Sequence, residues 1–137
     1  MASKTPPRKK HLHKVRIYYE DTDSGGVVYY ANYLKFFERA RTEMINSFGI
    51  SNKQLLEKYG AFIIVKSCNI EYIKPAKLEN ELKIISIILS VSKTSFTMKQ
   101  SIELNKDIIT NAEIKLVFVN KLGRPILIPE SFRNKLD

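Results

Sequence analysis

The 137-residue sequence contains one cysteine, no tryptophan and no long apolar segment. A single thiol, Cys68, cannot form an internal disulfide and cannot build a zinc site from cysteines alone. Because no run reaches the roughly eighteen apolar residues of a transmembrane helix, we expect no membrane span. The basic N-terminus also lacks the apolar stretch of a signal peptide. These absences predict a cytoplasmic protein, and the length predicts one domain.

The net charge of +9 is concentrated at the N-terminus. Residues 1–14 carry five basic side chains and no acid, so this segment holds +5 and the remaining chain +4. The two prolines of this segment favour a disordered, solubilising tail over residues 1–12, followed by a single domain over residues 13–137. Attraction to an anionic partner is the alternative. No recognition helix, zinc spacing or aromatic RNA-binding signature accompanies the charge, so nucleic acid is not expected as a partner.

Apolar residues at helical spacing predict one long helix over residues 31–48. Gly49 follows as a typical C-terminal stop. Ser51 and Gln54 then form a capping-box pattern, which predicts a short second helix that ends near Gly60.

The other segments alternate between apolar and polar residues, which is the pattern of half-buried strands. The four later strands are joined by loops too short for the crossovers that parallel pairing needs, so they predict an antiparallel meander. We expect a five-stranded antiparallel sheet that wraps around the long helix, in an α+β domain whose open edges favour a homodimer. The strands are predicted over residues 13–19 (with Val15, Ile17 and Tyr19 on one side), 62–73, 81–91, 94–104 and 108–119.

Candidate functional residues are densest in residues 18–33, where Asp21 and Asp23 precede Gly25, Gly26 and the start of the long helix. Glycines let the backbone approach a ligand closely. The first N–H groups of a helix have no partner within it and carry the positive end of its dipole. A carbonyl oxygen placed there is polarised, and a nearby carboxylate can attack the carbonyl or activate a water. The arrangement suits acyl transfer.

Three other interpretations of this segment compete. A calcium loop is excluded, because Gly25 and Val27 occupy ligand positions and Asn32 stands where the bidentate glutamate belongs. An Asp-x-Asp phosphatase site needs a parallel sheet with βα repeats, which successive antiparallel strands exclude. An ordinary Asp/Gly turn remains open on the residues alone. Cys68, in the middle of a predicted strand, is expected to be a small buried hydrophobe.

Residues 19–29, with 31–33 and 37–43, closely resemble the YbgC-like acyl-CoA thioesterases, which belong to the 4-hydroxybenzoyl-CoA thioesterase group. The resemblance continues through residues 67–72 and Pro75. It implies the hotdog fold, in which a five-stranded antiparallel sheet wraps around one long helix, assembled as a homodimer or homotetramer. It also implies hydrolysis of an acyl-CoA thioester to a free acid and coenzyme A without a cofactor or metal. Acyl carrier protein is the alternative carrier.

The matched positions imply the roles of individual residues. Asp23 is similar to the catalytic carboxylate, as nucleophile or general base, and the backbone N–H of Tyr30 is similar to the oxyanion donor. Many YbgC-like proteins have histidine at the position of Tyr30, whereas the 4-hydroxybenzoyl branch has tyrosine there. A non-catalytic protein that binds acyl-CoA or acyl carrier is the alternative function. The residues expected to contact the substrate are Gly25, Gly26, Val27 and Tyr33.

Overall fold

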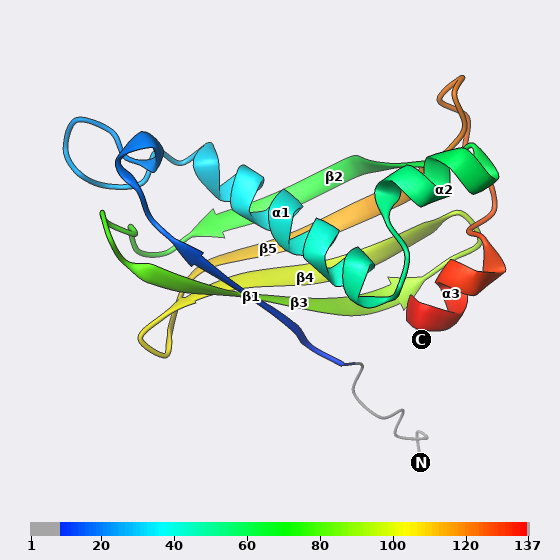
Figure 1. The fold of residues 1–137 in the computed structure, drawn as a ribbon. Helices are drawn as coiled ribbons and strands as arrows, with labels where there is room; N and C mark the ends of the chain where they lie inside the picture. The colour runs from blue at the N-terminus through cyan, green and yellow to red at the C-terminus, as the bar shows by residue number, and fades with distance from the viewer. Residues whose placement is uncertain (1–8, 137) are drawn as a thin grey trace, which may run out of the picture.

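The computed structural model describes residues 9–136. Within this range, five strands form one antiparallel sheet, and the long helix α1 crosses one of its faces (Figure 1). Helices α2 and α3 lie at the end of the sheet near the C-terminal end of α1. This arrangement confirms the predicted α+β fold. The elements are β1 (His11–Arg16), the 3-10 helix η1 (Tyr19–Asp21), α1 (Asn32–Ser47), α2 (Asn52–Tyr59), β2 (Phe62–Tyr72), β3 (Glu81–Val91), β4 (Ser95–Leu104), β5 (Asp107–Val119) and α3 (Glu130–Leu136).

The strand order is β1-β3-β4-β5-β2, so the predicted four-strand meander is wrong for β2. Strands β3, β4 and β5 do form a meander, but β2 pairs with β5 rather than with β3. The edge of β3 that a meander would offer to β2 is occupied by β1. Residues 73–80 reach about 26 Å when extended, which exceeds the roughly 14 Å of three strand spacings. Residues 73–80 are therefore long enough to pass β4 and β5 and to join β2 to β3.

Strand β1 begins earlier in the chain than predicted. It starts at His11 and ends at Arg16, whereas the sequence pattern predicted a strand over residues 13–19. Ile17 is fully buried and Val15 packs against the core, as expected. Tyr19 is 81% exposed because it belongs to η1, where the alternation of a strand no longer applies. The rest of the predicted tail, residues 1–8, lies outside the described residues.

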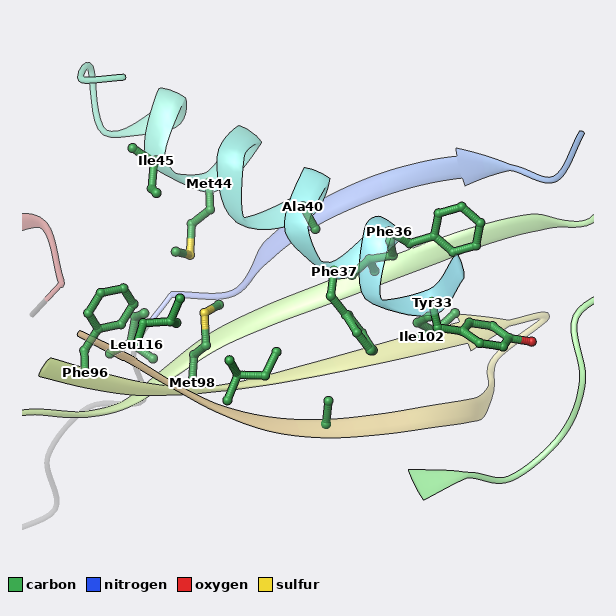
Figure 2. Packing of buried hydrophobic residues seen from close by; sticks show 14 of the residues in the cluster. Tyr33, Phe36, Phe37, Ala40, Met44, Ile45, Phe96, Met98, Ile102 and Leu116 are labelled. Carbon is green, nitrogen blue, oxygen red and sulfur yellow. The ribbon is translucent and has the colours of Figure 1, made fainter. Parts of the chain in front are cut away.

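Helix α1 lies within one residue of its predicted bounds at each end. Its buried face packs on the inner face of the sheet (Figure 2), and each fully buried large apolar side chain contributes about 1.5–3 kcal/mol. Gly49, with φ of 84°, adopts the left-handed conformation that ends the helix. The side chains that meet at this interface include Tyr33, Phe36, Phe37, Ala40, Met44 and Ile45 from α1, and Phe96, Met98, Ile102 and Leu116 from the sheet.

The predicted capping box at the start of α2 is present. Gln54 N donates to Ser51 Oγ at 3.1 Å, and Ser51 N donates to Gln54 Oε1 at 2.9 Å. Gly60 ends α2 with φ of 62°. Among residues 9–136, no helix is long and apolar enough to cross a membrane.

Candidate active site

Asp23 lies on a tight turn that its own carboxylate organises. Asp23 Oδ1 accepts hydrogen bonds from Gly25 N at 2.9 Å and Val27 N at 3.4 Å, and Asp23 N donates to Val27 O at 2.9 Å. A side chain at Gly25 would approach Asp23 Oδ1 to 3.3 Å, and Gly26 has φ of 80°, so both positions favour glycine. Among the described residues, these side-chain bonds all go to Oδ1. Asp23 is exposed, and no hydrogen bond from another described residue reaches its second oxygen, Oδ2.

The turn is fastened to the connection between β2 and β3. Val28 N donates to Ala76 O at 2.8 Å, and Leu78 N donates to Gly26 O at 3.2 Å. Val27 also forms an isolated β-bridge with Lys77. These backbone bonds hold the Asp23 turn against a segment about fifty residues later in the chain. Figure 1 shows the turn at the end of the sheet where α1 begins.

Asp21 connects this turn to the start of α1. Its backbone oxygen accepts from Tyr29 N at 3.1 Å and from the Asn32 side-chain Nδ2 at 2.8 Å. Its carboxylate accepts from Tyr18 N at 2.9 Å and is buried. Asp21 and Asn32 therefore set where α1 starts relative to Asp23.

The polypeptide enters α1 through a turn whose first amides have no acceptor in the part of the chain that the structure describes. Asn32 N, Tyr33 N and Leu34 N donate to carbonyls three residues earlier. The N–H groups of Tyr30 and Ala31 make no hydrogen bond with any described residue. They stand at the positive end of the dipole of a sixteen-residue helix. An oxyanion is the kind of ligand that such a pair of donors stabilises.

Tyrosine side chains form a wall beside these amides. The Tyr30 ring lies 4.9 Å from that of Tyr29 and 6.2 Å from that of Tyr72, between ring centroids. Tyr33 lies 5.5 Å from Tyr72. Burial raises the pKa of the Tyr33 and Tyr72 hydroxyls, so both stay protonated at neutral pH. A cavity of about 250 Å³ is lined by Val28, Tyr30, Tyr33, Tyr72, Ile73, Lys74 and Pro75.

The sequence-predicted residues thus fall into two adjoining groups. Asp23, with the three residues predicted at 25–27, forms the turn, whereas Tyr30 and Tyr33 line the cavity. Tyr33 is 3% exposed. Its hydroxyl accepts from Ala76 N at 3.0 Å, and the residue also lines the cavity. Sequence reasoning assigned no role to Tyr72. Tyr72 lies in the segment that resembles the YbgC-like family, but a tyrosine at the end of an apolar strand is too common to mark a site by itself.

Two further features lie outside this region. A larger cavity, about 510 Å³, lies between the C-terminal end of α1, α2 and α3, and it contains none of the predicted site residues. Among residues 9–136, no group of three or more histidine, cysteine, aspartate or glutamate side chains is placed to hold a metal ion. Cys68 is exposed on β2, so the prediction of a buried thiol is wrong. Cys68 lies on the edge strand of the sheet, where most side chains are exposed.

The family model described as the thioesterase-like superfamily matches residues 17–136, which include the whole candidate site. The chain belongs to the thioesterase-like superfamily. This superfamily member is 41% identical over 119 residues to the acyl-CoA thioester hydrolase YbgC of Escherichia coli, spanning 85% of this chain and 88% of the relative. It is 37% identical over 134 residues to the acyl-CoA thioesterase YbgC of Helicobacter pylori, spanning 90% of this chain and 98% of the relative. The resemblance to YbgC-like proteins is therefore confirmed.

Solved structures agree on the fold of this thioesterase-like chain. A probable thioesterase from Bartonella henselae superposes with a TM-score of 0.85 at 32% identity, covering 88% of this chain and 100% of that one. A 4-hydroxybenzoyl CoA thioesterase mutant in complex with 4-hydroxybenzoyl CoA gives a TM-score of 0.87 at 21% identity, covering 93% and 99%. The second likeness concerns the fold alone, and the two together confirm the hotdog architecture.

Proposed function

We propose that this chain hydrolyses acyl-CoA thioesters to a carboxylic acid and coenzyme A, with Asp23 as the reacting carboxylate. The observation that carries the proposal is the pairing of two features across one short turn. Gly25 N and Val27 N hold one oxygen of the Asp23 carboxylate and leave the other without a partner among residues 9–136. Two amides at the start of α1, seven and eight residues later, also lack an acceptor within this range. The YbgC relatives, which are acyl-CoA thioester hydrolases by name, support the reaction class.

The mechanism follows from the charges that develop during hydrolysis. The thioester carbonyl oxygen accepts hydrogen bonds from Tyr30 N–H and Ala31 N–H, and the helix dipole stabilises the negative charge that forms there. Asp23 Oδ2 then either attacks the carbonyl carbon, giving an acyl anhydride that water cleaves, or removes a proton from an attacking water. The coenzyme A thiolate leaves in both routes. The amides that hold Oδ1 keep the carboxylate oriented without consuming the reactive oxygen.

The substrate contacts that we propose follow the two groups of the site. Gly25, Gly26 and Val27 present backbone close to Asp23, where the thioester lies, and the acyl group enters the cavity beside the Tyr33 ring. The aromatic lining accepts an apolar acyl group of modest size. Coenzyme A is the proposed carrier, with acyl carrier protein as the alternative. The cytoplasmic location stays a prediction.

A homodimer is proposed from the free edge of β2. This eleven-residue strand pairs with β5 on one side, and among the described residues nothing pairs with its other side. An exposed edge that carries apolar side chains is a template for pairing with a second copy. A second copy would also cover Cys68. The exposed apolar residues of β2 and its end are Phe62 (40%), Ile64 (45%), Val65 (47%), Tyr72 (43%) and Ile73 (46%).

The deciding experiment measures free-thiol release from acyl-CoAs with two to sixteen carbons and from benzoyl-CoA. Wild type is compared with Asp23→Asn and with Glu20→Gln, a control that neutralises an exposed acid of the same segment. We expect wild type and the control to release thiol, and Asp23→Asn to lose about 100-fold or more, the range for removal of a general base or nucleophile.

An Asp23→Asn variant as active as wild type would contradict the role of Asp23. Tight acyl-CoA binding by wild type without any thiol release would instead favour the non-catalytic binding protein. Sedimentation velocity of wild type and of Ile64→Lys/Val65→Lys tests the dimer. We expect the double variant to sediment as a monomer, and a monomeric wild type would reject the proposed interface.

A further inference from the structure

A polar row interrupts the apolar inner face of the sheet beneath the middle of α1. On β4, Phe96, Met98 and Ile102 point inward, and Gln100 occupies the same row with 0% exposure. Its neighbour in register on β3 is Ser86, also fully buried, and its neighbour on β5 is the small Ala112. A polar or small residue therefore stands at the same level on three adjacent strands.

The Gln100 side chain connects this row to two successive turns of α1. Gln100 Nε2 donates to the Phe37 backbone oxygen and to Ser86 Oγ, each at 3.0 Å. Gln100 Oε1 accepts from Arg41 Nη1 at 3.0 Å. Both the nitrogen and the oxygen of one buried amide are thus directed at α1 and at β3. Figure 2 shows the Phe37 side chain, which marks this level of α1, directed at the sheet.

Such a network is a poor source of net stability. Burial lowers the pKa of the Arg41 guanidinium, and among the described residues no carboxylate forms a salt bridge with it. Replacing buried polar or charged groups with apolar groups of similar volume is often neutral or stabilising. A fully satisfied polar network does, however, select one packing arrangement over its neighbours, because any shift leaves buried groups unpaired. An apolar interface would tolerate small sliding and rotation of the helix.

We propose that Gln100 and Arg41 are positioning residues for the hydrolysis, and that they fix the rotation and axial position of α1 above the sheet. This inference rests on the proposed function. Phe37 lies seven residues from Tyr30, which is about 10 Å along the helix axis. A rigid helix transmits a shift at Phe37 to the amides that begin it. Because a misplacement of about 1 Å can cost about 100-fold in rate, the network sets catalytic geometry from a distance.

The test compares variants that remove the polar partners together with one that keeps a partner. Gln100→Met/Arg41→Met replaces the amide and the guanidinium with apolar side chains, so no buried charge or side-chain amide is left unpaired, and the Ser86 hydroxyl loses one donor. Gln100→Glu keeps an acceptor for Arg41 but loses the donors to Phe37 and Ser86. Met98→Leu is the matched control, a volume-conserving change at a fully buried position of the same inner row. For each, kcat and KM for acyl-CoA and the guanidinium unfolding midpoint are measured.

We expect the double variant to lose at least about tenfold in kcat, with KM and the unfolding midpoint close to those of wild type. Gln100→Glu should lose less kcat than the double variant, because Arg41 keeps a hydrogen-bond acceptor at position 100. The control should keep its kcat. A double variant with unchanged kcat, or one whose loss appears only in KM or only in proportion to lost stability, would overturn the proposal.

Amide hydrogen exchange separates this proposal from the proposed function, because it needs no turnover. The double variant should exchange the amides of residues 33–36 at least about tenfold faster than wild type, while those of β5 stay protected. Unchanged exchange in residues 33–36 would reject the positioning role even if the wild type hydrolysed no acyl-CoA. Faster exchange together with an inactive wild type would support the positioning of α1 and reject the reaction.

Discussion

The Tyr33 hydroxyl offers a sharp test of how the start of α1 is held. It is the acceptor for Ala76 N–H at 3.0 Å, and both residues are buried, at 3% and 0% exposure. Tyr33→Phe removes only the oxygen, so the ring packing remains while the amide is left unpaired away from water. An unsatisfied buried donor costs about 1–3 kcal/mol. For a domain of this length, that corresponds to a Tm lower by about 3–12 °C.

Guanidinium unfolding at a fixed protein concentration measures this cost, because a dimer would make the midpoint concentration-dependent. The midpoint should fall while the m-value stays constant. Tyr19→Phe is the control, since Tyr19 is 81% exposed and its loss of a hydroxyl should change stability by less than about 0.5 kcal/mol. A Tyr33→Phe variant within about 0.3 kcal/mol of wild type would refute the reasoning and imply that Ala76 N–H finds water or another acceptor.

Two further predictions concern the other end of the molecule and the edge strand β1. Phe132→Ala should lower the free energy of unfolding by about 3–5 kcal/mol, because this fully buried ring lies within 5.0–6.1 Å of three other phenylalanine rings, between centroids. Thermal unfolding measures the loss, and a value below about 1 kcal/mol would contradict the packing. Burial, with the charge of His13, lowers the pKa of His11 below its usual 6.5. The unfolded chain then binds a proton more readily, so the free energy of unfolding should fall as pH drops below about 6.5 and level off below the folded pKa. Urea unfolding between about pH 8 and pH 5 should show a smaller fall for His11→Gln, and an identical slope in both proteins would be inconsistent with this cause.

Local patterns predicted the helices well, because the information that defines them lies within a few residues. The helical spacing of apolar side chains marked α1 to within one residue at each end, and the capping box of Ser51 and Gln54 marked the start of α2. Strand boundaries were less accurate where the backbone leaves the sheet. Tyr19 fits the alternation of a strand, but η1 begins there because the chain must turn toward Asp23.

The candidate site was predictable in one half only. The residues around Asp23 are contiguous, so their spacing reveals a carboxylate, flexible glycines and a following helix together. Tyr72 ends β2 and Ala76 lies in the connection that follows it, both more than forty residues after Tyr30. The pairing of β2 with β5 and the backbone bonds of this connection bring them to the start of α1. No local pattern distinguishes them from ordinary strand and loop residues.

Short-range spacing and one contiguous motif were enough to predict α1, α2, the existence of five strands, the acidic turn and the family. Tertiary packing selects the partner of β2, the residues that are exposed at that edge, and the contact of Gln100 with α1. These depend on contacts between segments far apart in the chain. Such contacts are selected by the packing of the whole sheet against one helix, where the free energy of each pairing depends on all the others.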